Sequence, residues 1–405
     1  MSALSQVILP VTASIATFFL SVAAFFHLAN IPNPRRLILS PILYIPAGIS
    51  FYLSEWWPGD LNSLWGLLLC IWIGHSTSLL FVENDHLYQD GEYLARWSKL
   101  APHIHPKFHK GIKLWNNPRL LGTPHECILK SRKPAIPSGL RAFTVIRLAK
   151  VVIYAGLYFY IKTYIFPAAF MPIGMNEFDP LHQVYFRRLL PSFQAQDIYE
   201  AVTLRETLLR SAFVAWWTFS AVAMLDGSHA ALSLIAVSLC RFDTPSEWPP
   251  IFGPLSAAWS MRRFWGRFWH QIIRRTYTNY GEIVSRRILG LRAGSVMDKL
   301  IVIFAIFFLS GVSHAVVSWR LGDCAWGGDV WWFCLNFGVG MGEVVVLGVV
   351  RAGMKRTGRE DWVKSVQGSL FGRVIGYIWV FGFMFWSVPK WQYPKVYCVL
   401  EALSA

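Results

Sequence analysis

Apolar residues recur along this chain in runs of about 20 residues, and polar or charged segments separate the runs. As an α-helix, a run of that length crosses the hydrocarbon core of a bilayer. The pattern predicts eight membrane-spanning helices, at residues 6–28, 37–53, 61–82, 146–171, 207–240, 300–319, 328–350 and 372–389. The fifth would be roughly 50 Å long as a single helix. It must therefore tilt, or break at Gly227 within the sequence LDGSH.

Composition agrees with this pattern. The 405 residues are 54% hydrophobic and 15% charged, whereas a soluble domain carries about 25% charged residues. We therefore expect an all-α integral membrane protein that forms one domain over residues 1–405. The six cysteines are scattered without a C-x-x-C pair, so they predict neither a disulfide framework nor a zinc site.

The basic residues indicate how the helices are oriented. The alternate loops 29–36, 83–145, 241–299 and 351–373 hold 28 of the 38 Lys and Arg residues. Because cytosolic loops collect positive charge, these loops are predicted to be cytosolic and both termini lumenal. The segments 172–206, 320–327 and 390–405 then face the lumen. Membrane topology accounts for the net charge of +15, and no nucleic acid partner is expected.

One histidine lies inside a predicted span, in FFLSGVSHAVVSWR (residues 307–320). An ionisable group inside a span is costly and is by default a candidate functional residue. Ser310, His314 and Ser318 recur every four residues and form a polar stripe on an apolar helix. Burial keeps an imidazole neutral, and a neutral imidazole can act as a general base toward a hydroxyl group. The alternative is a histidine that hydrogen-bonds a neighbouring helix.

The next span carries a second candidate surface. In NFGVGMGE, Asn336, Gly340 and Glu343 stand at positions i, i+4 and i+7 and therefore share one helix face. We assign Asn336 and Glu343, with Ser310 and Ser318, to the substrate pocket. Helix packing around a buried, paired glutamate is an equally good interpretation of this face.

The segment MRRFWGRFWHQIIRR (261–275) separates two kinds of side chain when wound as a helix. Arg263, Arg267, His270 and Arg274 fall on one side, and Phe, Trp and Ile residues fill the other. Such a helix is typical of a cytosolic, interfacial amphipathic helix with its aromatic face in the membrane. The basic face could contact lipid headgroups, or it could bind a phosphate-bearing ligand such as coenzyme A through its arginines.

Two blocks carry a resemblance to a known family. The first is EWPPIFGPLSAAWSMRRFWGRFWHQIIRR, and FFLSGVSHAVVSW follows it about forty residues later. Together they resemble the wax synthase-like branch of the membrane-bound O-acyltransferases, and in particular the fungal acetyltransferases that modify terpenoids and meroterpenoids. The likeness is specific over residues 247–320 and only architectural elsewhere. Plant-type members often carry an acidic residue directly after the span histidine, where this chain has Ala315.

This resemblance implies a bundle of about eight transmembrane helices and roles for named residues. His314 matches the catalytic histidine, and His270 matches a second functional position. The acyl-CoA-binding residues would be Arg263, Arg267, Arg274, Trp265 and Trp269. Acetyl-CoA would be the co-substrate, with no bound cofactor and no metal, and a lipophilic alcohol and membrane lipid would be the partners. The protein would lie in the endoplasmic reticulum and act in secondary metabolism, or alternatively make long-chain wax or steryl esters.

Weaker signals favour other classes of protein. HIHPKFH contains His103, His105 and His109, but Pro106 makes one helical metal site through them improbable. ENDHLYQD (83–90) would suit a magnesium-dependent prenyltransferase or terpene cyclase, although no second acidic cluster accompanies it. Asp226 and His229, at i and i+3 in the fifth span, would suit the proton site of a transporter.

Overall fold

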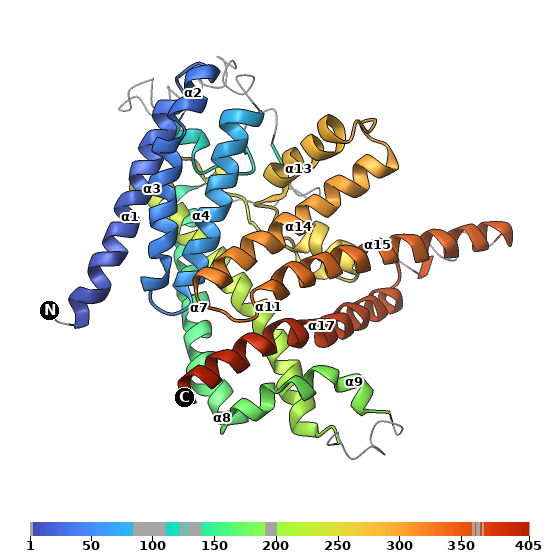
Figure 1. Cartoon of the computed structure of the whole chain (residues 1–405). Helices are drawn as coiled ribbons and strands as arrows, with labels where there is room; N and C mark the ends of the chain where they lie inside the picture. The colour runs from blue at the N-terminus through green and yellow to red at the C-terminus, as the bar shows by residue number, and fades with distance from the viewer. Residues whose placement is uncertain are drawn as a thin grey trace. The chain divides into compact units, whose positions relative to one another are not determined.

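The computed structural model describes residues 3–83, 111–121, 126–127, 139–190, 201–358, 361, 365–366 and 368–404. All regular secondary structure in these residues is helical (Figure 1). Residues 84–90 of ENDHLYQD, and His103, His105 and His109 of the possible metal site, lie outside the described part of the chain.

Eight helices in this described part are long and apolar enough to cross a membrane. They are Val7–Leu28, Asn33–Trp56, Leu61–Val82, Leu140–Phe170, Leu204–Leu239, Val296–Arg320, Gly327–Arg356 and Leu370–Leu403. Each overlaps one of the eight predicted spans, so the all-α, multi-pass fold class is confirmed. The long fifth helix runs without interruption through Gly227, so the break suggested there is wrong.

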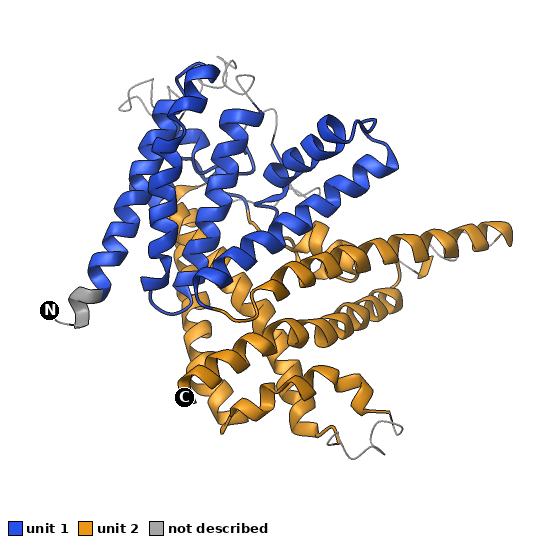
Figure 2. Cartoon of the chain, in the orientation of Figure 1, with its two compact units in different colours: residues 1–129, 235–249, 271–322 blue, residues 130–234, 250–270, 323–405 orange. Residues whose placement is uncertain are grey.

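The chain divides into two compact units, each built from three separate stretches (Figure 2). Unit 1 comprises residues 1–129, 235–249 and 271–322, and unit 2 comprises residues 130–234, 250–270 and 323–405. The single acyltransferase domain over residues 1–405 stays a prediction.

The helices of unit 1 are α1 (Ala3–Leu28), α2 (Asn33–Leu39), α3 (Pro41–Tyr52), η1 (Leu53–Trp56), α4 (Leu61–Thr77), η2 (Ser78–Val82), η8 (Pro245–Glu247), α13 (Arg274–Glu282), η11 (Ile283–Ile288) and α14 (Val296–Arg320). The core of this unit includes Phe25, Leu43, Trp72 and Leu80, contributed by α1, α3, α4 and η2. Buried Arg36 ties these helices together, because it donates to the carbonyl oxygens of Leu28 at 3.1 Å and of Leu80 at 2.7 Å.

The helices of unit 2 are α7 (Leu140–Tyr160), η4 (Ile161–Ile165), α8 (Phe166–Phe170), η5 (Met175–Phe178), η6 (Pro180–Val184), α9 (Tyr185–Arg188), α11 (Leu204–Ser233), η9 (Leu255–Ala257), α12 (Met261–Arg263), η10 (Phe264–Phe268), α15 (Gly327–Arg356) and α17 (Leu370–Ser404). The helix η7 (Leu234–Leu239) continues α11 and begins at the last residue of this stretch of unit 2.

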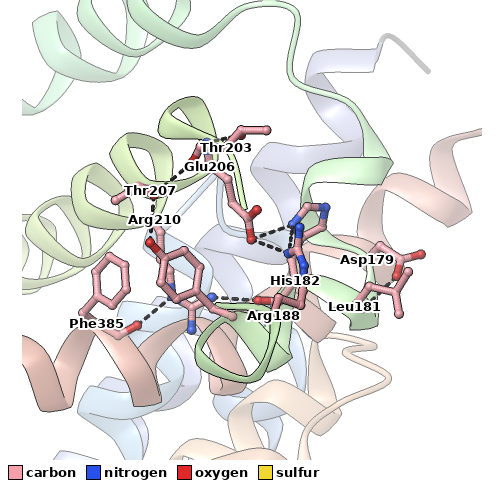
Figure 3. Close-up of polar contacts among 10 residues, drawn as sticks. Asp179, Leu181, His182, Arg188, Thr203, Glu206, Thr207, Arg210 and Phe385 are labelled. Atoms are coloured by element: carbon pink, nitrogen blue, oxygen red, sulfur yellow. Dashed lines mark hydrogen bonds and ion pairs between the residues drawn. The ribbon is translucent and has the colours of Figure 1, made fainter. Parts of the chain in front are cut away.

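A buried polar cluster joins four of these elements, η6, α9, α11 and α17 (Figure 3). Glu206 pairs with Nδ1 of His182 at 2.9 Å and with Nη1 of Arg188 at 2.7 Å. One turn further along α11, Arg210 donates to the carbonyl oxygens of Phe385 and His182, both at 2.8 Å. Because Arg210 is fully buried, these carbonyl groups replace the water that its guanidinium would otherwise require.

A disulfide joins the N-terminal side of α15 to α17. Cys324 and Cys398 are bonded, with their Cα atoms 6.4 Å apart. Beside them, the ammonium group of Lys395 pairs with Asp323 at 2.9 Å and with Asp329 at 2.8 Å. The sequence did not reveal this pair, since 74 residues separate the two cysteines. The other four cysteines have free thiols.

Candidate active site

The segment with the Phe-Trp-Gly-Arg sequence begins at α12, and side chains bind all three amides of that short helix. Ser260 accepts a hydrogen bond from the amide of Arg263 at 3.2 Å. The carboxylate of Glu343, on α15, accepts from the amide of Met261 at 2.7 Å and from that of Arg262 at 2.9 Å. The first amides of a helix have no partner inside it, so Glu343 and Ser260 together fix where the segment starts.

Asn336, also on α15, holds the middle of the segment. Its Oδ1 accepts from the indole N–H of Trp265 at 3.0 Å, and its amide group donates to the carbonyl of Trp332 at 2.8 Å. Asn336 is completely buried. The predicted shared face of Asn336 and Glu343 therefore exists, and in unit 2 it contacts the segment of residues 261–265.

The helical segment ends earlier than predicted. Met261–Arg263 and Phe264–Phe268 are helical, but Trp269 has an extended backbone with ψ of 151°, and the next helix, α13, begins at Arg274. The single helix predicted over residues 261–275 is therefore wrong. Gly253 contributes to this ending, since its amide donates to the carbonyl of Phe268 at 2.8 Å. A Cβ atom at Gly253 would collide with the Arg267 carbonyl oxygen.

The aromatic side chains of the segment pack within unit 2. Phe264 and Phe268 are buried, and Trp265 lies edge-on to Trp332 with ring centroids 5.8 Å apart. Trp269 stacks on Trp217 of α11 at 5.5 Å and an interplanar angle of 10°. The predicted membrane-facing role of these rings is therefore replaced by a protein core.

His270 is half-buried and lies against Phe252, with ring centroids 5.8 Å apart and an interplanar angle of 84°. His270 is the last residue of the stretch 250–270 of unit 2, and Gln271 begins the next stretch of unit 1. The imidazole of His270 therefore lies among aromatic side chains, next to Phe252 and Trp269.

A cluster of arginines lies at the start of the segment. Arg263 stacks on Trp259 with its guanidinium carbon 4.1 Å from the ring centroid, and its Nε donates to the carbonyl of Ala257 at 3.0 Å. Burial lowers the pKa of Arg263, and the nearby charges of Arg267, Arg262 and Arg373 lower it further. Four guanidinium groups of like charge therefore gather in unit 2.

Arg274 is not among the arginines of unit 2. It belongs to unit 1, is exposed, and its Nη1 donates to Oε1 of Gln271 at 3.2 Å. The predicted basic stripe through Arg263, Arg267, His270 and Arg274 depended on one continuous helix. It is lost because the backbone turns at Trp269.

In unit 1, α14 carries His314, which is half-buried. Within the predicted polar stripe, Ser310 is buried and its hydroxyl donates to the carbonyl of Ile306 in the same helix at 2.6 Å. Ser318 is half-buried. A hydroxyl that bonds one turn back along its own helix needs no partner on another helix, so Ser310 serves the helix that carries it.

Tyr277 of α13 hydrogen-bonds Ser313, the residue directly before His314. Its hydroxyl lies 2.6 Å from Oγ of Ser313, which itself donates to the carbonyl of Leu309 at 2.9 Å. Burial raises the pKa of Tyr277 to about 12, so its hydroxyl keeps its proton. The two helices also pack closely at Gly281, where a Cβ atom would stand 3.0 Å from Cα of Val302.

Polar contacts fix both ends of α14. Near its start, Asp298 accepts from the hydroxyl of Ser285 at 2.7 Å and from the amide of Gly294 at 2.6 Å. At its end, Arg320 donates to Glu55 at 2.6 Å. The helix carrying His314 is therefore held at both ends within unit 1.

A buried network that the sequence did not reveal holds α13 in place. Arg275 pairs with Glu83, donates to the carbonyl of Pro118 at 2.9 Å, and contacts Nδ1 of His75 at 2.7 Å. Nε2 of His75 lies 2.6 Å from the carbonyl of Leu114. A carbonyl only accepts, so Nε2 carries the proton and Nδ1 accepts from Arg275. Burial lowers the pKa of Arg275 to about 10.

The structure thus brings His270, Trp265, Trp269, Arg263, Arg267, Asn336 and Glu343 into unit 2, and Ser310, His314, Ser318 and Arg274 into unit 1. Gly253, Tyr277 and Arg275 are the contributors that sequence reasoning missed, because their partners are distant in the chain.

Asp226 and His229, the residues that would suit a transporter's proton site, contact residues of a neighbouring helix. Asp226 pairs with Lys150 at 2.5 Å and accepts from the hydroxyl of Tyr154 at 3.1 Å, while His229 lies 3.5 Å from Arg147. These contacts join α11 to α7, which favours a packing role over a proton site. Among the described residues, no group of three His, Cys, Asp or Glu side chains could hold a metal ion.

Fold and site define a multi-pass, all-α membrane protein with a motif segment held on one helix and a histidine on another. Residues 248–335 match the sequence model of the membrane bound O-acyl transferase family. This match includes both His270 and His314, and it confirms the family resemblance drawn from the sequence.

The chain is also similar to named fungal proteins. It is 32% identical to acetyltransferase ple2 of Rhodocybe pseudopiperita over 47% of this chain and 48% of that protein. It is 31% identical to acetyltransferase atnC of an Arthrinium species, over 49% and 44% of the two chains, and 32% identical to acetyltransferase nanB of Aspergillus nanangensis, over 46% and 43%. The chain therefore spans about half the length of these curated relatives. No solved structure matches it.

Proposed function

We propose that this protein is a membrane-bound O-acyltransferase that transfers the acetyl group of acetyl-CoA to a hydroxyl of a lipophilic terpenoid or meroterpenoid. The observation that carries this proposal is the family match over residues 248–335, because that range includes both candidate catalytic histidines. The relatives named acetyltransferases support the choice of acyl group.

The proposed chemistry is direct transfer without an acyl-enzyme. His314 takes the proton from the alcohol while its oxygen attacks the thioester carbonyl and forms a tetrahedral intermediate. His270 donates a hydrogen bond to the developing oxyanion. When the intermediate collapses, the carbon–sulfur bond breaks, the ester is released, and the imidazolium returns the proton to the CoA thiolate.

The arginine cluster is proposed to bind the phosphates of CoA. Within the described residues, no carboxylate forms an ion pair with Arg262, Arg267 or Arg373, so their charges are available to an anion. Arg263 is pre-oriented by its stack on Trp259, and guanidinium groups suit bidentate contacts with phosphate. This assignment keeps Arg263 and Arg267 and adds Arg262 and Arg373. Arg274 remains a weaker candidate.

We place the protein in the endoplasmic reticulum membrane, with the basic loops cytosolic. The disulfide supports this orientation independently of charge, because disulfides persist in oxidising compartments such as the ER lumen. Cys324 and Cys398 both fall in segments that the charge pattern predicts to be lumenal. The arginine cluster then lies on the cytosolic side.

The test is acetyl transfer in microsomes that contain wild type, His314→Ala or His270→Ala. Labelled acetyl-CoA is supplied with a lipophilic extract of candidate alcohols. His27→Ala is the matched control, since His27 is an exposed histidine at the end of α1. We expect His314→Ala to lose roughly 10²–10⁴-fold in rate, with the control unchanged at equal expression.

Two outcomes would overturn parts of this proposal. Equal rates in His314→Ala and wild type would reject His314 as the base. If wild type accepts palmitoyl-CoA and not acetyl-CoA, the protein is a long-chain wax or steryl ester synthase.

A further inference from the structure

Three N–H donors from two other elements converge on the carboxylate of Glu343. The amide of Met261 donates to Oε1 at 2.7 Å, and the amide of Arg262 donates to Oε2 at 2.9 Å. The indole of Trp379, on α17, also donates to Oε1, at 2.6 Å. Both oxygens are therefore engaged, in short bonds of the length expected for an ionised acceptor.

A close backbone contact reinforces the same junction. At Gly376, one turn before Trp379 on α17, a Cβ atom would collide with the carbonyl oxygen of Trp259. The backbone of α17 thus lies directly against the residues that lead into α12. Glu343 on α15, Trp379 and Gly376 on α17, and Met261 on α12 form one rigid corner of unit 2.

We propose that Glu343 is a positioning residue for the arginine cluster and does not contact substrate. This inference rests on the proposed acyl-CoA site. Glu343 carries the negative charge of this corner. In the described part of the chain its oxygens accept hydrogen bonds from two backbone amides and an indole, and not from the arginine side chains. Glu343 thereby fixes α12, which carries Arg262 and Arg263, against α15 and against α17, which carries Arg373. The guanidinium groups that would bind phosphate are not neutralised.

The proposal is an alternative to the pocket role that the sequence predicted for Glu343. A carboxylate whose oxygens accept three N–H groups is committed to the protein, whereas a pocket residue would present an oxygen to the substrate hydroxyl. The two roles predict different kinetic effects, because a fault in the corner displaces the arginines and a fault in the pocket weakens binding of the alcohol.

The first experiment measures KM values for Glu343→Gln. Glutamine keeps the shape but replaces one accepting oxygen with an NH₂ group, so at least one of the three donors loses its acceptor. We expect KM for acetyl-CoA to rise about 10-fold while KM for the alcohol and kcat stay within about threefold. A rise in KM for the alcohol with acetyl-CoA unaffected would overturn the proposal, as would no change in either.

The second experiment does not depend on activity. Hydrogen exchange at the amides of Met261 and Arg262 is compared between wild type and Glu343→Gln, with a peptide from α14 as internal control. We expect faster exchange at one or both of these amides and no change in the α14 peptide, because the NH₂ group of glutamine cannot accept a hydrogen bond. Unchanged exchange overturns the positioning role. Faster exchange in a protein without transferase activity would retain that role and reject the proposed function.

Trp379→Phe separates the carboxylate from the packing of α17. Phenylalanine keeps an aromatic ring but removes the indole N–H, and the two backbone bonds to Glu343 remain. Protection at Met261 and Arg262 should then stay within about twofold of wild type. Acceleration equal to that in Glu343→Gln would mean that α17 holds the corner and that the carboxylate does not.

Discussion

Replacing Arg275 by methionine should destabilise unit 1 strongly. The side chain is buried, and its guanidinium bonds Glu83, His75 and the Pro118 carbonyl. Removing one partner of a buried ion pair costs about 3–5 kcal/mol. Glu83 keeps two other donors, the hydroxyl of Ser78 at 2.7 Å and the amide of Asn279 at 2.5 Å. The lower value, about 3 kcal/mol, is therefore the expected loss in the free energy of unfolding.

The assay is thermal unfolding of purified protein in detergent. For a unit of this size, about 3 kcal/mol corresponds to a fall in Tm of roughly 6–12 °C. The neighbouring Arg274→Met is the matched control, because Arg274 is exposed and a surface change should stay within about 0.5 kcal/mol. Adding Glu83→Gln to Arg275→Met should recover part of the loss, because it removes the buried charge left without its partner. A Tm for Arg275→Met within about 2 °C of the control would refute this reasoning.

Three further predictions concern other parts of the molecule. The Cys324–Cys398 disulfide predicts that reduction of the denatured protein exposes two additional thiols to a maleimide, and an unchanged thiol count would contradict it. Asp226→Asn and Lys150→Met should each lower the free energy of unfolding by about 3 kcal/mol, and the double variant by clearly less than their sum; additive losses would mean that the pair does not interact. Burial raises the pKa of Glu247 above its ordinary 4.5, so the folded state binds the carboxyl proton more tightly than the unfolded state. The stability that this proton contributes is lost as the pH rises through the folded-state pKa. Glu247→Gln should therefore reduce the decline of Tm as the pH rises above 4.5, the ordinary pKa of this carboxyl, and identical slopes in the two proteins would count against the shift.

The eight long helices could be predicted because their cause is local. Twenty apolar residues in sequence are sufficient to require a helix in a bilayer, and no knowledge of their neighbours is needed. The helix over residues 261–275 failed for the opposite reason. Its aromatic face satisfies the amphipathic period, but the surfaces that it contacts include Trp217 and Trp332, which are distant in the chain. Periodicity indicates that a face is apolar and does not distinguish lipid from protein.

The same limit applied to the charged residues. Arg274 and Arg275 are adjacent, and the helical wheel favoured Arg274 because it aligned with the other arginines. Arg274 is exposed in the structure, and Arg275 is buried against His75, Glu83 and Pro118. For Asn336 and Glu343 the wheel placed both on one face correctly, and their role in the substrate pocket stays a prediction. The groups they bind begin at Met261, 82 residues before Glu343.

Several polar side chains inside the apolar helices of unit 2 share one kind of partner, a tryptophan N–H. Indoles donate to Asn336 at 3.0 Å, to Glu343 at 2.6 Å, to Asp329 at 2.6 Å and to Ser387 at 3.3 Å. In hydrocarbon a polar group without a hydrogen bond is costly, and an indole supplies a donor without adding a charge and while burying a large apolar ring. This use explains part of the high tryptophan content, 20 residues. It also means that a carboxylate or amide in a span of a tryptophan-rich protein is first a candidate acceptor for an indole. Histidine differs, because a neutral imidazole nitrogen can take up a proton from a hydroxyl group, whereas the Asn336 amide cannot and both oxygens of Glu343 already accept hydrogen bonds. By this reasoning His314, and not Asn336 or Glu343, keeps the stronger claim to the chemistry.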